Sequence, residues 1–120
     1  MSLAYNLLAE SKEKLQFSPG DAIFKEGDEG DLMYVILEGE VLIIAGGQVV
    51  DELSKGDLFG EMALIDSSPR SATATAKSAC TLAPLDQANF MFLLQHAPYF
   101  SIHVMSVMAE RLRKMLTITG

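Results

Sequence analysis

Residues 59 to 76, FGEMALIDSSPRSATATA, place one carboxylate and one guanidinium nine residues apart in a segment rich in turn-forming residues. Arg70 offers a planar fork of N–H donors that matches two oxygens of a phosphate, and Pro69 before it reduces the entropy lost when the fork is held in place. Glu61 begins EMALI, a good single turn of helix whose first amides have no helical acceptor and therefore attract an anion. These features predict a phosphate-binding segment.

A carboxylate beside a phosphate is repulsive unless it accepts a hydrogen bond from another group of the ligand. A sugar hydroxyl next to a cyclic phosphate is the obvious donor, so we expect Glu61 to bind a ribose. The alternative is structural, with Arg70 paired to Glu61 or to a surface acid and nothing bound. The agreement in spacing of Gly60, Glu61, Pro69 and Arg70 within one segment favours a ligand site.

The charge of the whole chain excludes a polyanion as its partner. Nine Lys and Arg against sixteen Asp and Glu give a formal net charge of -7. Twelve of the acids lie in residues 21–66, where Lys25 and Lys55 are the only basic residues. We therefore expect no nucleic acid to bind this chain by itself, and an anion near the acidic segment must be held by local donors.

The length and hydropathy of the chain predict one domain over residues 1–120, with room for a single core. No run approaches the roughly 18 apolar residues of a membrane span, and no secretory signal is visible. The expected location is the cytoplasm, with no membrane partner.

Catalytic and metal chemistry are not indicated. His96 and His103 lie on a helical segment without a metal-binding or nucleophile motif, and no histidine falls within the strand-forming residues 18–84. The single Cys80 is expected to be a small buried hydrophobe, and the acidic residues 27–31 lack the alternating ligands of a calcium loop. We expect no catalytic residue, no metal and no cofactor, hence no enzyme.

The elements that must position Glu61 and Arg70 are predicted from the spacing of apolar residues. Leucines at helical spacing predict a leading helix within residues 1–16. Short β-prone runs separated by turn residues predict an antiparallel sandwich or barrel over residues 17–85, which contains the segment 59–72. Two helices are expected in residues 86–117, the first capped by Asp86 and ended near Pro98.

The second of these helices, from about Tyr99 to Leu116, is expected to carry an unusually wide apolar stripe. The seam of that stripe consists of Ile102, Met105, Ala109, Leu112 and Leu116. One side can pack on the domain and another can meet a second copy, and both possibilities stay open because two heptads are fewer than a free coiled coil needs. The basic residues Arg111, Arg113 and Lys114 complement the negative end of the helix.

Around Glu61 and Arg70 the sequence resembles the cyclic nucleotide-binding domain family. This family includes the bacterial catabolite activator protein and the regulatory subunits of cyclic AMP-dependent protein kinase. FGEMAL followed by PRSAT is similar to that family's phosphate-binding cassette, FSPGDAIFKEGDEGDLMYVILEGEV looks like its opening strands, and MAERLRKM looks like its C-terminal helix. The resemblance implies a mainly β fold, a double-stranded β-helix or jelly-roll-like barrel with N- and C-terminal α-helices. It also implies a non-catalytic regulatory module for signal transduction.

By that resemblance Glu61 takes the ribose 2′-hydroxyl and Arg70 takes the cyclic phosphate. The further ligand-binding residues that it implies are Gly60, Met62, Ala63, Ser71, Ala72 and Met115. Met115 and Leu116 fall where the catabolite activator protein reads adenine from its C-terminal helix, and neither has a polar group. The choice between cyclic AMP and cyclic GMP therefore stays open, with cyclic AMP favoured as the commoner ligand of resembling domains.

The sequence leaves the use of the site open. In the favoured interpretation the domain senses the nucleotide and relays occupancy through its last helix, with Met115 closing over the purine and a possible homodimer formed through the same helix. In a second interpretation the site is vacant and the barrel serves as a dimerisation or interaction module. In a third, the chain is the sensor half of a longer transcription regulator, channel or kinase.

Overall fold

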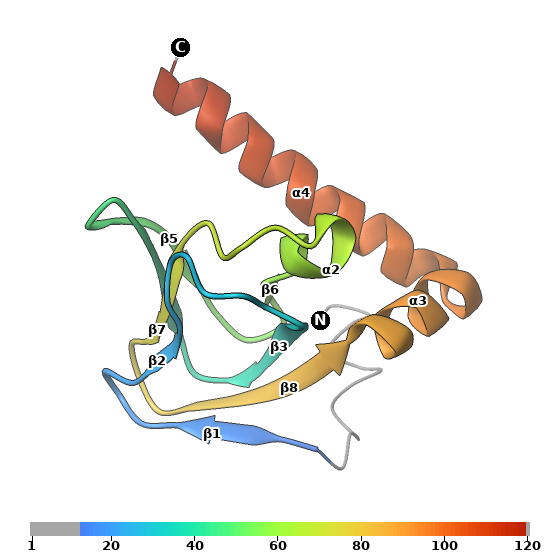
Figure 1. Ribbon diagram of the computed structural model, residues 1–120, viewed down its shortest axis with the longest axis horizontal. Coiled ribbons are helices and arrows are strands. Elements are labelled where there is room, and N and C mark those ends of the chain that lie inside the picture. The colour runs from blue at the N-terminus through green and yellow to red at the C-terminus, as the bar shows by residue number, and fades with distance from the viewer. Residues whose placement is uncertain (1–12, 120) are drawn as a thin grey trace.

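The computed structural model describes the backbone of residues 13–119 and the side chains of residues 13–114 and 116. Its strands form two four-stranded antiparallel sheets, and three helices gather at one end (Figure 1). The first sheet consists, in order, of β1 (Leu15–Phe17), β8 (Cys80–Asp86), β3 (Leu32–Glu38) and β6 (Leu58–Phe59). The second consists of β2 (Ala22–Phe24), β7 (Thr73–Ala76), β4 (Val41–Ala45) and β5 (Gln48–Leu53).

Strand β3 lies at the centre of the core because both of its faces are covered. Tyr34 and Ile36 point toward the second sheet and belong to a cluster with residues of β4, β5 and β7. The alternate residues Met33, Val35 and Leu37 point the other way, into a second cluster that includes residues of the helices. This two-sided burial explains why LMYVIL reads as a continuous apolar run rather than as an alternating one.

The helices are α2 (Met62–Asp66), α3 (Gln87–His96) and α4 (Pro98–Thr119). The Asp86 side chain accepts a hydrogen bond of 2.9 Å from the Asn89 amide, so Asp86 caps α3 as the sequence predicts. Helix α4 packs on the first sheet through Phe100 and Val104, and its C-terminal end lies far from α3 (Figure 1). No helix of the described residues is long and apolar enough to cross a membrane.

The fold class expected from the sequence, mainly β with flanking helices and a jelly-roll-like arrangement, is confirmed, although the sheets face each other without closing into a barrel. The predicted leading helix lies outside the described residues as far as residue 12. Its expected end was wrong, because Leu15 pairs with Leu82 in β1. Alternating burial of Leu15, Gln16 and Phe17 suits a short edge strand better than the last turn of a helix.

Candidate functional site

The candidate site is built around Gly60, which follows β6 and begins the connection to β7. Its φ of +83° lies in the region that favours glycine. A Cβ added there would lie 2.8 Å from Arg70 Nη1 and 3.3 Å from the Leu32 carbonyl oxygen. Gly60 therefore has two roles. Its backbone conformation makes the turn before Glu61, and its lack of a side chain leaves space for the Arg70 guanidinium.

Glu61 enters α2 with its side chain turned into the protein, where it is 1% exposed. Its carbonyl oxygen accepts from the amides of Leu64 at 3.0 Å and Ile65 at 3.2 Å, so the helical hydrogen bonds begin there. The amides of Met62 and Ala63 come before these bonds and are available to a ligand. Of the two carboxylate oxygens, Oε2 is buried with no partner among the described residues.

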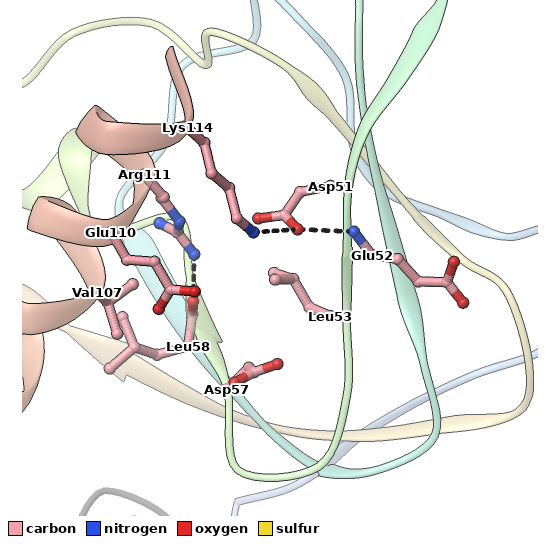
Figure 2. A pocket seen from close by; sticks show the side chains of 9 residues that line it. All are labelled: Asp51, Glu52, Leu53, Asp57, Leu58, Val107, Glu110, Arg111 and Lys114. Carbon is pink, nitrogen blue, oxygen red and sulfur yellow. Dashed lines mark hydrogen bonds and ion pairs between the residues drawn. The ribbon is translucent and has the colours of Figure 1, made fainter. Parts of the chain in front are cut away.

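The other carboxylate oxygen of Glu61 is bound by Arg111 of α4. Arg111 Nη1 donates to Glu61 Oε1 in an ion pair, and Arg111 Nη2 donates to the Leu58 carbonyl oxygen at 2.6 Å. Figure 2 shows Arg111 reaching from α4 toward Leu58. One guanidinium thus joins the last helix both to the buried acid and to strand β6, and it neutralises the charge of Glu61.

Arg70 is also buried, with 7% of its surface exposed. Nη1 donates to the Gly60 carbonyl oxygen at 2.9 Å, Nη2 donates to the Leu32 carbonyl oxygen at 2.6 Å, and the guanidinium carbon lies 4.0 Å from the ring centroid of Phe24. Nε is buried with no partner among the described residues. Because a guanidinium carries five N–H groups and these two hydrogen bonds use only two of them, Arg70 keeps donor capacity for a ligand.

The electrostatic surroundings of Arg70 favour the arrival of an anion. Burial lowers the pKa of the Arg70 guanidinium, because a charge in a partly dehydrated site loses its hydration. The neighbouring Tyr34, Asp31, Asp28 and Glu61 act in the opposite direction but do not cancel the effect. Among the described residues no ion pair involves Arg70. A bound anion would therefore supply the negative partner that the buried guanidinium lacks.

The structure places the residues predicted from the sequence unevenly around this centre. Met62 is half exposed on α2, Ala63 is buried beneath it, and Ser71 is exposed after Arg70. Ala72 is half-buried at the entrance to β7. Met115 lies in α4, but its side chain falls outside the described residues, so its expected position over a purine stays a prediction.

The structural alternative drawn from the sequence, a pair between Arg70 and Glu61, does not form. Glu61 pairs with Arg111, which the sequence analysis had assigned only to the charge at the helix end. A sequence signal for this role existed, since Arg111 follows Phe100, Val104 and Val107 at the spacing of one helix face. A charge on a buried face requires a partner.

The packed face of α4 therefore differs from the seam expected from the sequence. The seam residues Ile102, Met105, Leu112 and Leu116 are 55%, 60%, 57% and 62% exposed. Phe100 and Val104 are buried instead. More than half of the surface of Ile102, Met105 and Leu112 thus stays exposed in this domain.

A pocket that Arg111 helps to line lies between β5 and α4 and has a volume of about 180 Å³. Figure 2 shows its walls, with Lys114 reaching across to Asp51; the Nζ to Oδ1 distance is 3.2 Å. Leu53, Leu58 and Val107 form its apolar floor. Among the described residues, no group of three or more His, Cys, Asp or Glu side chains is placed to hold a metal ion.

Known proteins are similar to this chain both in sequence and in fold. Residues 14–97 match the family described as the cyclic nucleotide-binding domain. A cGMP-dependent protein kinase of Toxoplasma gondii is 43% identical over 72 residues, which are 60% of this chain and 7% of the relative. A cAMP-dependent protein kinase regulatory subunit of Debaryomyces hansenii is 42% identical over 87 residues, which are 71% of this chain and 19% of the relative.

Among solved structures, the catabolite activator protein of Thermus thermophilus superposes with a TM-score of 0.82 at 30% sequence identity, over 99% of this chain and 59% of that one. The chain thus spans less than two thirds of the length of each of these three proteins.

Proposed function

Because the chain belongs to the cyclic nucleotide-binding domain family, we propose that its site binds a cyclic purine nucleotide, with cyclic AMP favoured, and that it acts as a regulatory rather than a catalytic module. One observation carries this proposal. Two buried side chains of opposite charge, Glu61 and Arg70, flank Gly60 without pairing with each other, and each keeps a buried polar atom without a partner among the described residues. Such atoms are costly unless a ligand satisfies them.

The roles follow from the donors and acceptors that remain. Arg70 has N–H groups left for the cyclic phosphate, and the amides of Met62, Ala63 and Ser71 add neutral donors. Glu61 Oε2 accepts from the ribose 2′-hydroxyl, because a carboxylate can only accept. Arg111 on Oε1 balances the charge of Glu61, so that the carboxylate can lie near the phosphate without strong repulsion.

The same contacts provide the relay through the last helix. Arg111 connects α4 to Glu61 and to the Leu58 carbonyl oxygen, so a ligand that orders Glu61 also favours the docked position of the helix. A ligand shifts a conformational equilibrium only through its differential affinity for the two states, and this contact supplies a difference. Met115, one turn further along α4, would add to it by closing over the purine.

The exposed seam of α4 supports a homodimer as the output of this relay. Its apolar residues Met105 and Leu112 are more than half exposed. A helix that is ordered by the ligand presents this face to a second copy more favourably than a frayed one. The chain also matches a short part of much longer kinases and regulators, so the same helix can instead lead into a further domain.

Calorimetric titration of the chain with cyclic AMP, cyclic GMP and the non-cyclic 5′-AMP tests the proposal. We expect one or both cyclic nucleotides to bind and 5′-AMP to bind much more weakly. Arg70→Glu should abolish binding, because loss of a charged hydrogen bond costs about 2 to 5 kcal/mol and the reversed charge repels the phosphate. Lys25→Glu is the matched control, since Lys25 is an exposed residue whose reversal makes the same change in net charge.

If neither nucleotide binds the parent chain, the vacant-site interpretation replaces this one. Equal affinity in Arg70→Glu and the parent would reject the assignment of the phosphate to Arg70. Equal loss in Lys25→Glu and Arg70→Glu would mean that the overall field, rather than the local donors, controls binding.

A further inference from the structure

Gly30, in the connection between β2 and β3, lies directly against the guanidinium of Arg70. A Cβ added to Gly30 would lie 2.7 Å from Arg70 Nη2 and closer still to Nε and Cζ. A Cβ is essentially never found within 3.0 Å of another heavy atom, so a side chain at position 30 must displace the Arg70 guanidinium or shift the backbone. The backbone of Gly30 lies outside the left-handed region, whereas Gly27 has a φ of +89°. Glycine is therefore required at position 30 for space and not for backbone conformation.

The guanidinium occupies a narrow slot between two glycines. Gly30 bounds it on the side of Nε and Nη2, and Gly60 bounds it on the side of Nη1, where an added Cβ would lie 2.8 Å away. Within the slot, the carbonyl oxygens of Leu32 and Gly60 and the ring of Phe24 set its orientation. The atoms that orient Arg70 thus come from residues 24–32 and from Gly60.

The same connection also holds the backbone of Arg70. The Gly27 amide donates to the Arg70 carbonyl oxygen at 2.8 Å, and the Arg70 amide donates to the Asp28 carbonyl oxygen at 2.8 Å. The turn that presents these groups is closed by the Asp28 side chain, which accepts from the Lys25 amide at 3.0 Å. Because the backbone at position 70 is fixed by this pair, a methyl group at position 30 would move the flexible end of the arginine rather than the chain.

From this geometry we infer that Gly30 is a positioning residue for Arg70, and that a side chain at position 30 makes the site vacant while leaving the fold in place. The inference rests on the proposed function, because it assigns Gly30 to the arginine that takes the phosphate. Position 30 then distinguishes a domain of this kind that can bind from one that cannot, although Gly30 itself need not touch the ligand.

The binding test compares Gly30→Ala with Glu29→Ala, a change at the adjacent exposed residue. Calorimetry with cyclic AMP and cyclic GMP should show affinity reduced roughly tenfold or more in Gly30→Ala, the range expected when a charged hydrogen bond is lost. Glu29→Ala should bind like the parent. Unchanged affinity in Gly30→Ala overturns the inference, and so does an equal loss in both variants.

A second test needs no ligand and separates this inference from the proposed function. Gly30→Ala should lower the unfolding temperature by about a few degrees in the parent chain, because Arg70 loses its buried contacts. In an Arg70→Ala background, Gly30→Ala should not lower the unfolding temperature, because the guanidinium atoms that the added methyl group would contact are absent. An equal decrease in both backgrounds would give Gly30 a role in the backbone alone and overturn the inference.

If Arg70→Ala does not fold, the comparison of the two backgrounds is replaced by a measurement of the ¹H–¹⁵N resonance of Arg70 Nε in the parent, Gly30→Ala and Glu29→Ala. The guanidinium carbon, to which Nε is bonded, lies over the Phe24 ring, so we expect a ring-current shift of the Nε resonance in the parent that Gly30→Ala abolishes and Glu29→Ala retains. An Nε resonance that is the same in parent and Gly30→Ala overturns the inference. If the parent binds neither nucleotide, the proposed function fails, and these two measurements still decide whether Gly30 positions Arg70.

Discussion

Replacing Arg111 by methionine probes the contact on which the proposed relay depends. Methionine keeps most of the apolar length of the side chain but removes the donors to Glu61 Oε1 and to the Leu58 carbonyl oxygen. Glu61 is then left as a buried carboxylate, 1% exposed, without its ion-pair partner. Water cannot hydrate the unpaired Glu61 carboxylate unless the structure opens, so the substitution should destabilise the fold.

The magnitude follows from the burial of the two partners. Removing one partner of a buried ion pair costs about 3 to 5 kcal/mol of unfolding free energy. The Arg111 side chain is 30% exposed, so solvent screens part of the pair and we expect a loss near the lower limit, about 3 kcal/mol. Lys114→Met is the matched control, because the Lys114–Asp51 pair is half exposed on the lysine side and should be worth about 0 to 1 kcal/mol.

Urea unfolding of the parent, Arg111→Met, Lys114→Met and the double variant Glu61→Gln with Arg111→Met measures these differences. The double variant should recover about 1 to 3 kcal/mol relative to additivity, since the buried charge is removed together with its partner. Calorimetry on the same proteins should show weaker nucleotide binding in Arg111→Met than in Lys114→Met. If Arg111→Met is as stable as Lys114→Met and binds nucleotide equally well, the contact has no role in the relay and the reasoning fails.

Three further predictions follow from the site, from α4 and from the surface. A 2′-deoxy cyclic nucleotide should bind the parent about 1.5 to 3 kcal/mol more weakly than its ribose form, and Glu61→Gln should reduce this difference in calorimetry; a difference of full size in the variant would make Glu61 structural only. Met105→Glu and Leu112→Glu should leave the unfolding temperature nearly unchanged because both positions are exposed, while sedimentation should show reduced self-association; a parent that stays monomeric with nucleotide contradicts the homodimer. The hydrogen bond from Lys77 is the main cause that lowers the pKa of Glu52, so the pair stabilises the fold above the ordinary glutamate pKa, about 4.3, and this stabilisation is lost as pH falls through the lower folded value. Lys77→Met should therefore flatten acid unfolding in that range, and superimposable curves would show that the pair contributes nothing.

The candidate site illustrates which parts of a binding site are local in the sequence. Gly60, Glu61, Pro69 and Arg70 lie within one short segment, so their residue types and spacing were enough to predict a phosphate-binding turn. The strand-forming runs and the Asp86 cap were predictable for the same reason, since each depends on neighbours within a few residues. The short β1 was missed because Leu15 continues a helical pattern of leucines, and its pairing with Leu82 is a contact that local spacing does not encode.

The sequence by itself determined the class of fold, the presence of one acid and one base at a tight turn, and the family that these residues resemble, because all three rest on short-range patterns. Only the tertiary structure decided what each charge contacts. Arg111 reaches Glu61 across fifty residues because Phe100 and Val104 set which face of α4 is buried, and Gly30 lies against Arg70 because the β2–β3 connection pairs with the backbone at position 70. The packing of distant elements creates such contacts, and so the spacing within any one segment does not predict them.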